Sequence, residues 1–229
     1  MEKKARLFSE KMKNYDLIIF DMDGTILDTL EDLQDSLNYA LKQMNYPERS
    51  YQEVRSFVGN GLANLVRLAV PKDTNEELQQ EVLTILKSHY SVHCQDKTKP
   101  YEGICELLSD LRAHGYKTAV VSNKVDSAVH QLCEEYFTGL FDMSIGERSD
   151  LNRKPAPDAV WEVLKVLDVP KERAIYIGDS EVDVLTAKNS LLDMITVTWG
   201  FRDKEMLLLH GATNFADTME DVRNYLNVL

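Results

Sequence analysis

The fold is decided by the stretch Leu17-Ile18-Ile19-Phe20-Asp21-Met22-Asp23-Gly24-Thr25. Its four consecutive apolar residues predict a strand buried on both faces, which is typical of a parallel sheet. In the polar turn that follows, Gly24 gives the backbone enough freedom to bring the carboxylates of Asp21 and Asp23 together. One carboxylate of such a pair can attack a phosphorus atom while the other moves a proton at the leaving oxygen. The plain alternative is that these residues only form a turn.

Three later segments show the same change from apolar to polar residues. They predict strands at Thr118–Val121, Ala174–Ile177 and Met194–Val197. Between the strands, apolar residues recur at helical spacing in Ile104–Leu111 and in Val160–Leu167. Strands that alternate with helices predict an α/β fold, a doubly wound Rossmann-like parallel sheet with right-handed crossovers.

One long region breaks this alternation directly after the first strand. Residues 28–98 show helical spacing, with helices expected at 30–44, 51–57, 62–70 and 76–92. The connection is far longer than an ordinary crossover. We therefore expect an inserted all-α cap domain at 28–98, within an α/β core formed by 1–27 and 99–229, with hinges near residues 26–30 and 94–100.

Each of the other strand ends also carries polar residues. Because ligands of open α/β sheets bind beyond the carboxyl ends of the strands, we expect these residues to share one site. Ser122 and Asn123 can cradle a phosphate, and Lys154 can neutralise one of its oxygens. Asp179 and Asp183 offer the hard oxygen ligands that suit Mg²⁺. A helix cap, a surface lysine and an acidic helix start are the plain alternatives for each cluster alone.

Together, these segments resemble the four motifs of the haloacid dehalogenase superfamily of phosphohydrolases. The matching residues are Asp21-Met22-Asp23-Gly24-Thr25, Ser122-Asn123, Lys154-Pro155 and Gly178-Asp179-Ser180-x-x-Asp183. The helical insertion is similar to the first cap type of that superfamily. Within the superfamily the chain resembles phosphoglycolate phosphatases, through the segments Phe57–Gly61, Val121–Lys124, Arg153–Asp158 and Trp199–Arg202. It departs from the usual pattern at Ala187–Leu192, where a glycine-rich stretch is common.

The resemblance implies a Mg²⁺-dependent phosphomonoester hydrolase for a small metabolite, with 2-phosphoglycolate as the first expectation. Asp21 is then the nucleophile that forms an aspartyl-phosphate, and it needs no separate base if its pKa is ordinary. Asp23 is the acid that protonates the leaving alkoxide and the base that activates water. Mg²⁺ would be held by Asp21, the backbone carbonyl of Asp23 and Asp179. Asp183 would orient a metal-bound water or Lys154.

The remaining roles concern the substrate. The resemblance implies that Ser122, Asn123 and Lys154 hold the phosphoryl oxygens, and Thr25 is counted among the substrate-binding candidates. The cap is expected to close over the site and to read the leaving group. The candidates for that reading are Arg55, Arg67 and Asn60, although an exposed arginine on a cap helix is an equally good interpretation.

Three other functions remain open on the same residues. A phosphomutase similar to β-phosphoglucomutase would share the paired aspartates and the cap. A pyrophosphatase or a nucleotidase on the same fold would differ only in the substrate. A non-catalytic phosphate-binding protein is disfavoured, because such a protein has no use for the proton-transfer aspartate Asp23.

Composition limits the partners and the location. The net charge of −12 and the pI of about 4.9 disfavour nucleic acid and anionic membranes as partners. We expect a cytoplasmic protein, because residues 1–15 lack a signal-peptide pattern and no apolar run approaches a membrane span. Either a monomer or a homodimer is compatible with this composition. His89 and His93 have metal-ligand spacing, but no third ligand is evident, so a polar helix face is expected.

Overall fold

The structure is a computed structural model that describes residues 15–228. Residues 1–14, for which the sequence predicts no signal peptide, lie outside this range. The described residues form a six-stranded parallel sheet in the order β5-β4-β1-β6-β7-β8. The strands are β1 (Leu17–Phe20), β4 (Lys117–Val125), β5 (Met143–Glu147), β6 (Ala174–Gly178), β7 (Asp193–Val197) and β8 (Phe215–Ala216). The predicted doubly wound α/β fold is confirmed.

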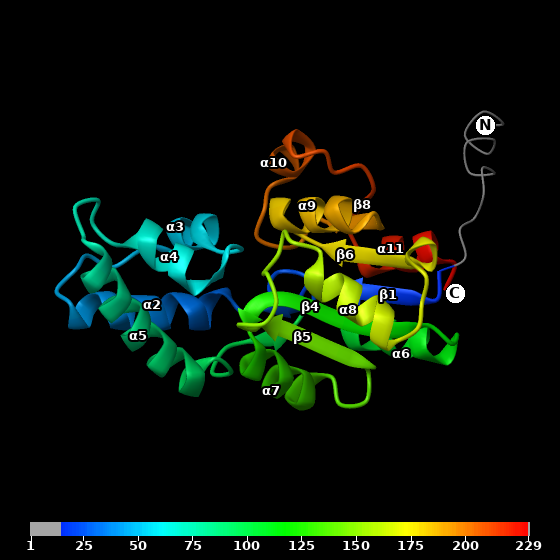
Figure 1. Ribbon diagram of the computed structural model, residues 1–229, viewed down its shortest axis with the longest axis horizontal. Coiled ribbons are helices and arrows are strands. Elements are labelled where there is room, and N and C mark those ends of the chain that lie inside the picture. Colours follow the sequence, from blue (N-terminus) through cyan, green and yellow to red (C-terminus); the bar gives the residue numbers. More distant parts are fainter. Residues whose placement is uncertain (1–14, 229) are drawn as a thin grey trace.

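Helices cover both faces of the sheet (Figure 1). On one face Ile18 and Phe20 of β1 pack in a core with α6 (Ile104–Ala113), α7 (Asp126–Tyr136) and α11 (Met219–Leu226). On the other face Leu17 and Ile19 pack with α8 (Asp158–Val166) and α9 (Glu181–Ser190). Two short helices complete the lobe, η1 (Lys171–Arg173) and α10 (Lys204–Leu209). Successive side chains of β1 thus enter opposite cores, which explains why its sequence is apolar without alternation.

The central strand β1 lies at the switch point of the sheet. It pairs with β4 on one side and with β6 on the other, so the chain winds away from it in both directions. Such a point opens a crevice beyond the carboxyl ends of the strands. Asp21, Ser122 and Asp179 belong to the ends of β1, β4 and β6, so all three meet at this crevice.

Within the six-stranded sheet, two strands were absent from the sequence prediction, and a third extends well past its predicted end. β5 lies at an edge of the sheet and contains Gly146, and its burial is incomplete, so its sequence lacks an apolar run. β8 has only two residues and lies at the other edge. β4 continues to Val125, past the apolar segment, because its polar end enters the site. Edge strands carry a weaker sequence signal, since only part of their surface is buried.

A second lobe contains four helices, namely α2 (Leu30–Gln43), α3 (Tyr51–Phe57), α4 (Gly61–Ala69) and α5 (Glu76–His93). It lies to the left of the sheet in Figure 1. The four helices match those expected within 28–98. They enclose an apolar core of their own, which includes Leu37, Leu41, Val66 and Leu86. This lobe therefore has the packing of a separate helical unit.

The two chain segments that join the lobes pair with each other. They form a short antiparallel ribbon, in which β2 (Leu27–Asp28) pairs with β3 (Lys99–Pro100). Beside the ribbon, the buried carboxylate of Asp32 on α2 accepts hydrogen bonds from the backbone N–H groups of Lys97 and Thr98, at 2.8–3.1 Å. Asp32 thereby fastens the segment that leaves the helical lobe to the helix that enters it.

We predict that Asp32→Ala lowers the free energy of unfolding by about 2–4 kcal/mol, because it leaves two N–H groups without an acceptor. The matched control is Asp35→Ala on the same helix, which removes a surface ion pair with Lys97 and is expected to cost less than about 1 kcal/mol. Urea denaturation measures both values. Equal losses for the two variants would contradict the role given to Asp32.

Candidate active site

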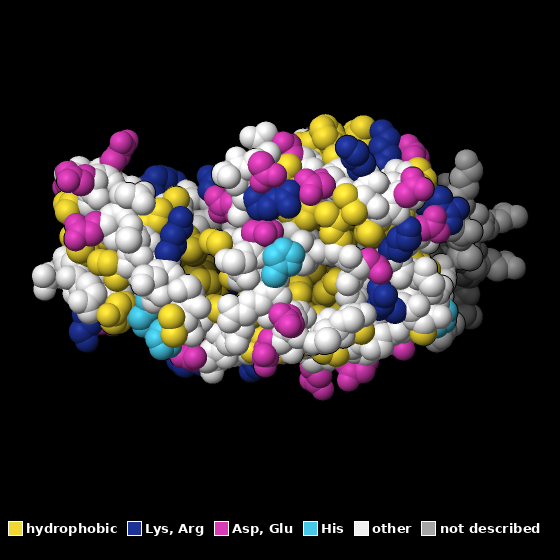
Figure 2. Space-filling view, turned by 60° about the horizontal axis from the view of Figure 1, so that its bottom comes forward, with side chains coloured by type: hydrophobic (Ala, Val, Ile, Leu, Met, Phe, Trp, Pro, Cys, Tyr) yellow, Lys and Arg dark blue, Asp and Glu magenta, His cyan; other side chains and the backbone are white. Residues whose placement is uncertain are grey.

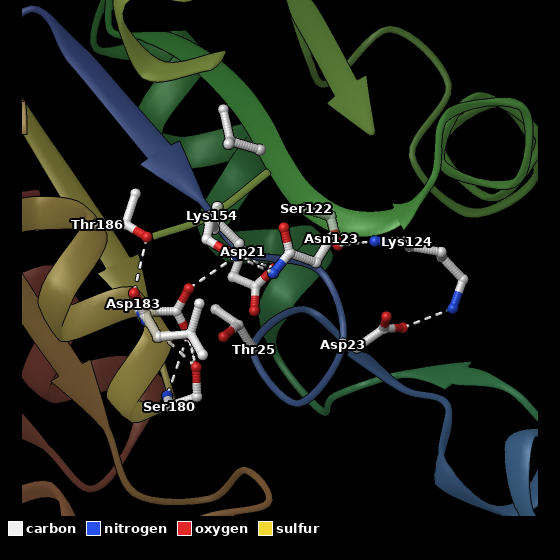
Figure 3. A network of polar contacts seen from close by, with 12 residues as sticks. Asp21, Asp23, Thr25, Ser122, Asn123, Lys124, Lys154, Ser180, Asp183 and Thr186 are labelled. Carbon is white, nitrogen blue, oxygen red and sulfur yellow. Dashed lines mark hydrogen bonds and ion pairs between the residues drawn. The ribbon is translucent and has the colours of Figure 1, made fainter. Parts of the chain in front are cut away.

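The site is organised around a buried pair, Asp21 and Lys154 (Figure 3). Asp21 follows β1, and its backbone N–H donates to the carbonyl of Ile177 on β6, which fixes the start of the turn. The Oδ1 atom of Asp21 lies 2.7 Å from Nζ of Lys154, and the Lys154 side chain is only 3% exposed. The structure thus brings together a strand end and a loop that are far apart in the sequence.

Asp183, in the first turn of α9, holds Lys154 in place. Its Oδ1 accepts from Nζ of Lys154 at 2.8 Å and from the hydroxyl of Tyr176 at 3.2 Å. Its Oδ2 accepts from the backbone N–H and the hydroxyl of Ser180, in a capping box at the start of the helix. Both oxygens are therefore occupied by donors, which favours a positioning role over direct metal ligation.

Asp179, at the end of β6, is held by two donors. The hydroxyl of Thr25 donates to Oδ1 at 3.1 Å, and the backbone N–H of Phe201 donates to Oδ2 at 2.7 Å. Thr25 was expected to bind substrate, but its hydroxyl is directed to Asp179, and Thr25 does not line the cavity described below. Its contact is that of a positioning residue.

Two glycines allow the backbone to approach Asp179 closely. A Cβ atom at Gly24 would lie 2.5 Å from Oδ2 of Asp179, and one at Gly200 would lie 2.4 Å from the same atom. Gly24 also has a φ of +85°, a conformation that other residues rarely adopt. Gly24 and Gly200 are thus required because no larger residue would fit against the carboxylate of Asp179.

The acidic groups of the site lie close enough to share a cation. Asp21, Asp179 and Asp183 each offer a carboxylate oxygen, and these atoms lie within 4.8 Å of one another. Burial, together with the charge of Asp183, raises the pKa of Asp179 to about 7. Burial, again with Asp183, raises the pKa of Asp21 well above its usual range, although Lys154 opposes the shift. The pKa of Asp21 is therefore not ordinary in the protein alone, and a cation bound nearby would lower it again. The buried acidic cluster could hold such a metal ion.

Ser122 and Asn123, at the end of β4, line the cavity beside Asp21. Nδ2 of Asn123 donates to the carbonyl of Lys154 and to that of Gly59 in the helical lobe. Its Oδ1 is buried and has no hydrogen-bond partner among the described residues. Both residues predicted to hold phosphate thus lie where the strand ends converge.

Asp23 points away from the acidic cluster, toward Lys124 (Figure 3). Its Oδ1 lies 2.8 Å from Nζ of Lys124, which in turn donates to the hydroxyl of Tyr90 on α5 at 2.6 Å. Burial raises the pKa of Tyr90 to about 12, so this phenol stays neutral. The segment Val121–Lys124 carried part of the family resemblance, but the sequence gave Lys124 no role, because nothing local shows that it meets Asp23.

The three residues expected to contact the leaving group do not lie at the cavity between the lobes. Arg67 is exposed and donates to Oδ1 of Asn64 on its own helix. Arg55 pairs with Asp203. Asn60 precedes α4, and none of the three lines the cavity. All three residues lie in the helical lobe, but spacing alone could not tell which helix face turns toward the sheet.

Arg202 joins the two lobes and was not predicted. It donates to Glu181 on α9 and to the carbonyls of Arg55 and Val58 in the helical lobe. The sequence did contain a signal, because Phe57–Gly61 and Trp199–Arg202 both carried the family resemblance. The structure shows that these two segments touch.

A cavity lies between the lobes, at the strand ends. It is partly open to solvent and is lined by residues of both lobes. The sheet contributes polar groups to its wall, among them Asp21, Asp23 and Lys154. The helical lobe contributes mainly apolar side chains, namely Leu33, Val58, Leu62 and Leu65. Figure 2 shows hydrophobic side chains in the recess between the two lobes.

The family is shown by a match over most of the chain. Residues 18–197 match the family described as haloacid dehalogenase-like hydrolase, and they include all the strand ends that form the site. The chain belongs to this family. It is a hydrolase of the phosphatase type.

The chain is also similar to individual named proteins and to solved structures. The chain is 33% identical over 204 residues to a phosphoglycolate phosphatase of Rhodobacter capsulatus, across 87% of this chain and 92% of that protein. It is 31% identical to a phosphoglycolate phosphatase of Pseudomonas savastanoi pv. phaseolicola, across 96% and 81%. The crystal structure of a Lactobacillus delbrueckii protein, provisionally assigned as a phosphoglycolate phosphatase, matches with a TM-score of 0.89 and 42% identity, across 93% and 98%. Among residues 15–228 no helix has the length and apolarity needed to cross a membrane.

We predict that Mg²⁺ stabilises the protein more at high pH than at low pH. A carboxyl whose pKa is higher in the folded protein than in the unfolded chain, where it is about 4, contributes to stability at low pH. This contribution to the free energy of unfolding is lost as the pH rises through the pKa of the folded protein. For Asp179 that value is about 7. Mg²⁺ should therefore raise Tm more at about pH 8 than at about pH 5, where Asp179 is mostly protonated.

Thermal unfolding with and without Mg²⁺, at matched ionic strength, tests this prediction. The variant Asp179→Asn should lose most of the Mg²⁺-dependent shift at the higher pH. An equal shift at both pH values, or one that survives in the variant, would place the cation elsewhere.

Proposed function

We propose that the protein is a Mg²⁺-dependent phosphomonoesterase that acts on a small phosphorylated metabolite through an aspartyl-phosphate on Asp21. The observation that carries this proposal is the buried Asp21–Lys154 contact beside Asp179, with the second carboxylate, Asp23, on the other side of the turn. A nucleophile, a cation and a separate proton carrier are the groups that phosphoryl transfer requires.

In the first step an oxygen of Asp21 forms a bond to phosphorus, and the bond between phosphorus and the ester oxygen breaks. Lys154 and Ser122 stabilise the phosphoryl oxygens as their charge changes. Asp23 gives its proton to the leaving oxygen, so an alcohol departs. In the second step Asp23 takes a proton from water, the water oxygen bonds to phosphorus, and Asp21 is released with inorganic phosphate.

The donor set fits magnesium. Carboxylate oxygens of Asp21 and Asp179, with the backbone carbonyl of Asp23, would hold the ion, and substrate and water would complete its coordination. Mg²⁺ supplies the positive charge that lets these carboxylates and a phosphate share one pocket. Asp183 acts on Lys154, because all its hydrogen-bonding positions face Lys154, Tyr176 and Ser180.

The helical lobe is proposed to be the cap, formed by residues 28–98 on a core formed by the rest of the chain. The ribbon of β2 and β3 joins the lobes and lies within the two segments where hinges were expected. Contacts across the cavity, from Arg202 to Val58 and from Asn123 to Gly59, close the cap over the site. A closed cap excludes bulk water from the phosphoryl group.

2-Phosphoglycolate is the first candidate substrate. This choice is supported by relatives that are named phosphoglycolate phosphatases and that match along nearly the whole chain. Asp21, Asp179 and Lys154 line the cavity, so the phosphoryl group of a small ester bound there can reach them.

We expect Asp21→Asn to lower the rate of phosphate release from 2-phosphoglycolate at least about a thousandfold, because an amide is a poor nucleophile. The matched control is Asp168→Asn, an exposed change at a left-handed position that asparagine also tolerates. Phosphate release with Mg²⁺ and with EDTA measures both. Near wild-type release by Asp21→Asn would exclude the aspartyl-phosphate mechanism.

Asp23→Asn is expected to separate the two steps of the reaction. p-Nitrophenolate leaves without an acid, so p-nitrophenyl phosphate should give a stoichiometric burst of p-nitrophenolate followed by slow turnover. Alkyl esters need the acid, and their single-turnover rate should fall about 10²–10⁴-fold. Stopped-flow absorbance and rapid quenching measure these rates. Unchanged turnover of both kinds of ester would remove Asp23 from the mechanism.

A further inference from the structure

Thr29 places a buried hydroxyl in the cavity wall without a partner. The residue is 1% exposed, and its Oγ1 has no hydrogen-bond partner among the described residues. Thr29 precedes α2, but its side chain makes no capping bond to that helix. It lines the cavity between the lobes. A buried hydroxyl that gives up its usual local bond is costly unless something else binds it, and the cavity is where a ligand can do so.

In the same cavity, Lys124 has one hydrogen-bond donor for which residues 15–228 provide no partner. A lysine ammonium carries three N–H donors, and those of Lys124 reach Asp23 at 2.8 Å and Tyr90 at 2.6 Å. The Lys124 side chain is 5% exposed, so bulk water offers little to the third donor. Lys124 lines the cavity, and a ligand there is the natural partner for that donor.

The other cationic side chains of the cavity wall, Lys154 and Arg202, already have hydrogen-bond partners within the protein. Lys154 uses its three donors on Asp21, Asp183 and Tyr176. Arg202 is matched in charge by Glu181 and donates to carbonyls of the helical lobe. Among the described residues that line this cavity, Lys124 is therefore the cation best able to bind a further group.

The position of Lys124 assigns it to one end of the substrate. Lys154 contacts the nucleophile Asp21 and so lies at the phosphoryl end. Lys124 contacts Asp23, which hands its proton to the ester oxygen, and so lies at the leaving-group end. Lys154 is thus placed to bind the phosphoryl group, and Lys124 is placed to bind the leaving group.

The apolar part of the cavity wall limits which leaving groups can bind there. The helical lobe also lines this cavity with Leu33, Leu62 and Leu65, which offer no hydrogen bonds to the many hydroxyls of a sugar. One buried cation and one hydroxyl suit a short group with one anionic end. The carboxylate of a small hydroxy acid has this chemistry.

Building on the proposed function, we propose that Lys124 and Thr29 form the leaving-group subsite, and that this subsite selects phosphate esters of small hydroxy acids. The ammonium of Lys124 pairs with the carboxylate of the leaving group, and the hydroxyl of Thr29 supplies a second hydrogen bond. Tyr90 holds the ammonium from the helical lobe, so the subsite is complete only when the two lobes are together.

The test compares two esters that differ mainly in one carboxylate, 2-phosphoglycolate and ethyl phosphate. We expect wild-type kcat/KM to favour 2-phosphoglycolate. Lys124→Met should reduce this preference about 10- to 100-fold, and Thr29→Val about fivefold, while Lys124→Arg should keep most of it. The ratio is the readout, because Lys124→Met also removes a partner of Asp23 and can slow both esters alike.

The matched control is Lys87→Met, an exposed change on the same helix as Tyr90, which should leave the ratio unchanged. A preference that survives in Lys124→Met, or a wild-type enzyme that prefers ethyl phosphate, would overturn the subsite. Either result leaves the proposed function intact if Asp21→Asn still abolishes turnover of both esters.

A binding measurement keeps the proposal testable without turnover. Calorimetric titration of 2-phosphoglycolate into Asp21→Asn protein with Mg²⁺ should show Kd raised about 10- to 100-fold by the added change Lys124→Met. Ethyl phosphate should show little difference between the two proteins. Equal Kd values for 2-phosphoglycolate would refute the subsite, and a fully active Asp21→Asn protein would refute the proposed function instead.

Discussion

The whole site depends on one buried ammonium, that of Lys154, between the carboxylates of Asp21 and Asp183. A buried charge is tolerated only when it is paired and hydrogen-bonded, and Lys154 meets this condition with three partners. Asp179 nevertheless adds a third carboxylate to a cluster that has one lysine. The remaining negative charge is the reason for proposing that a metal cation completes the site before a phosphate binds.

The parallel sheet makes this concentration of charge possible. Because β1 lies between β4 and β6, three strand ends open on one crevice, and each supplies a different part of the site. The helical lobe then covers the crevice and adds Tyr90 and Thr29 to its wall. In the proposed function, the core therefore carries out the reaction, and the contact between the lobes selects the ester.

Sequence reasoning recovered the parts of the molecule that are local in the chain. The buried run Leu17–Phe20 and the motif after it predicted the fold and the groups around Asp21, and helical spacing predicted the second lobe. Edge strand β5 carries no such run and was missed. Arg55 and Arg67 were assigned to the leaving group, yet they contact Asp203 and Asn64. Lys124 and Thr29 line one cavity because the two lobes pack together, and spacing along the chain does not encode that packing.

The central claim is that Asp21 carries the phosphoryl group during turnover. The most direct measurement is rapid acid quenching of the wild-type enzyme with Mg²⁺ and 2-phosphoglycolate, followed by peptide mass spectrometry. The account predicts a transient peptide that contains Asp21 and is heavier by one phosphoryl group, formed and lost at rates that sustain turnover. Rapid phosphate release with no such peptide, or with the phosphoryl group on another residue, would contradict it.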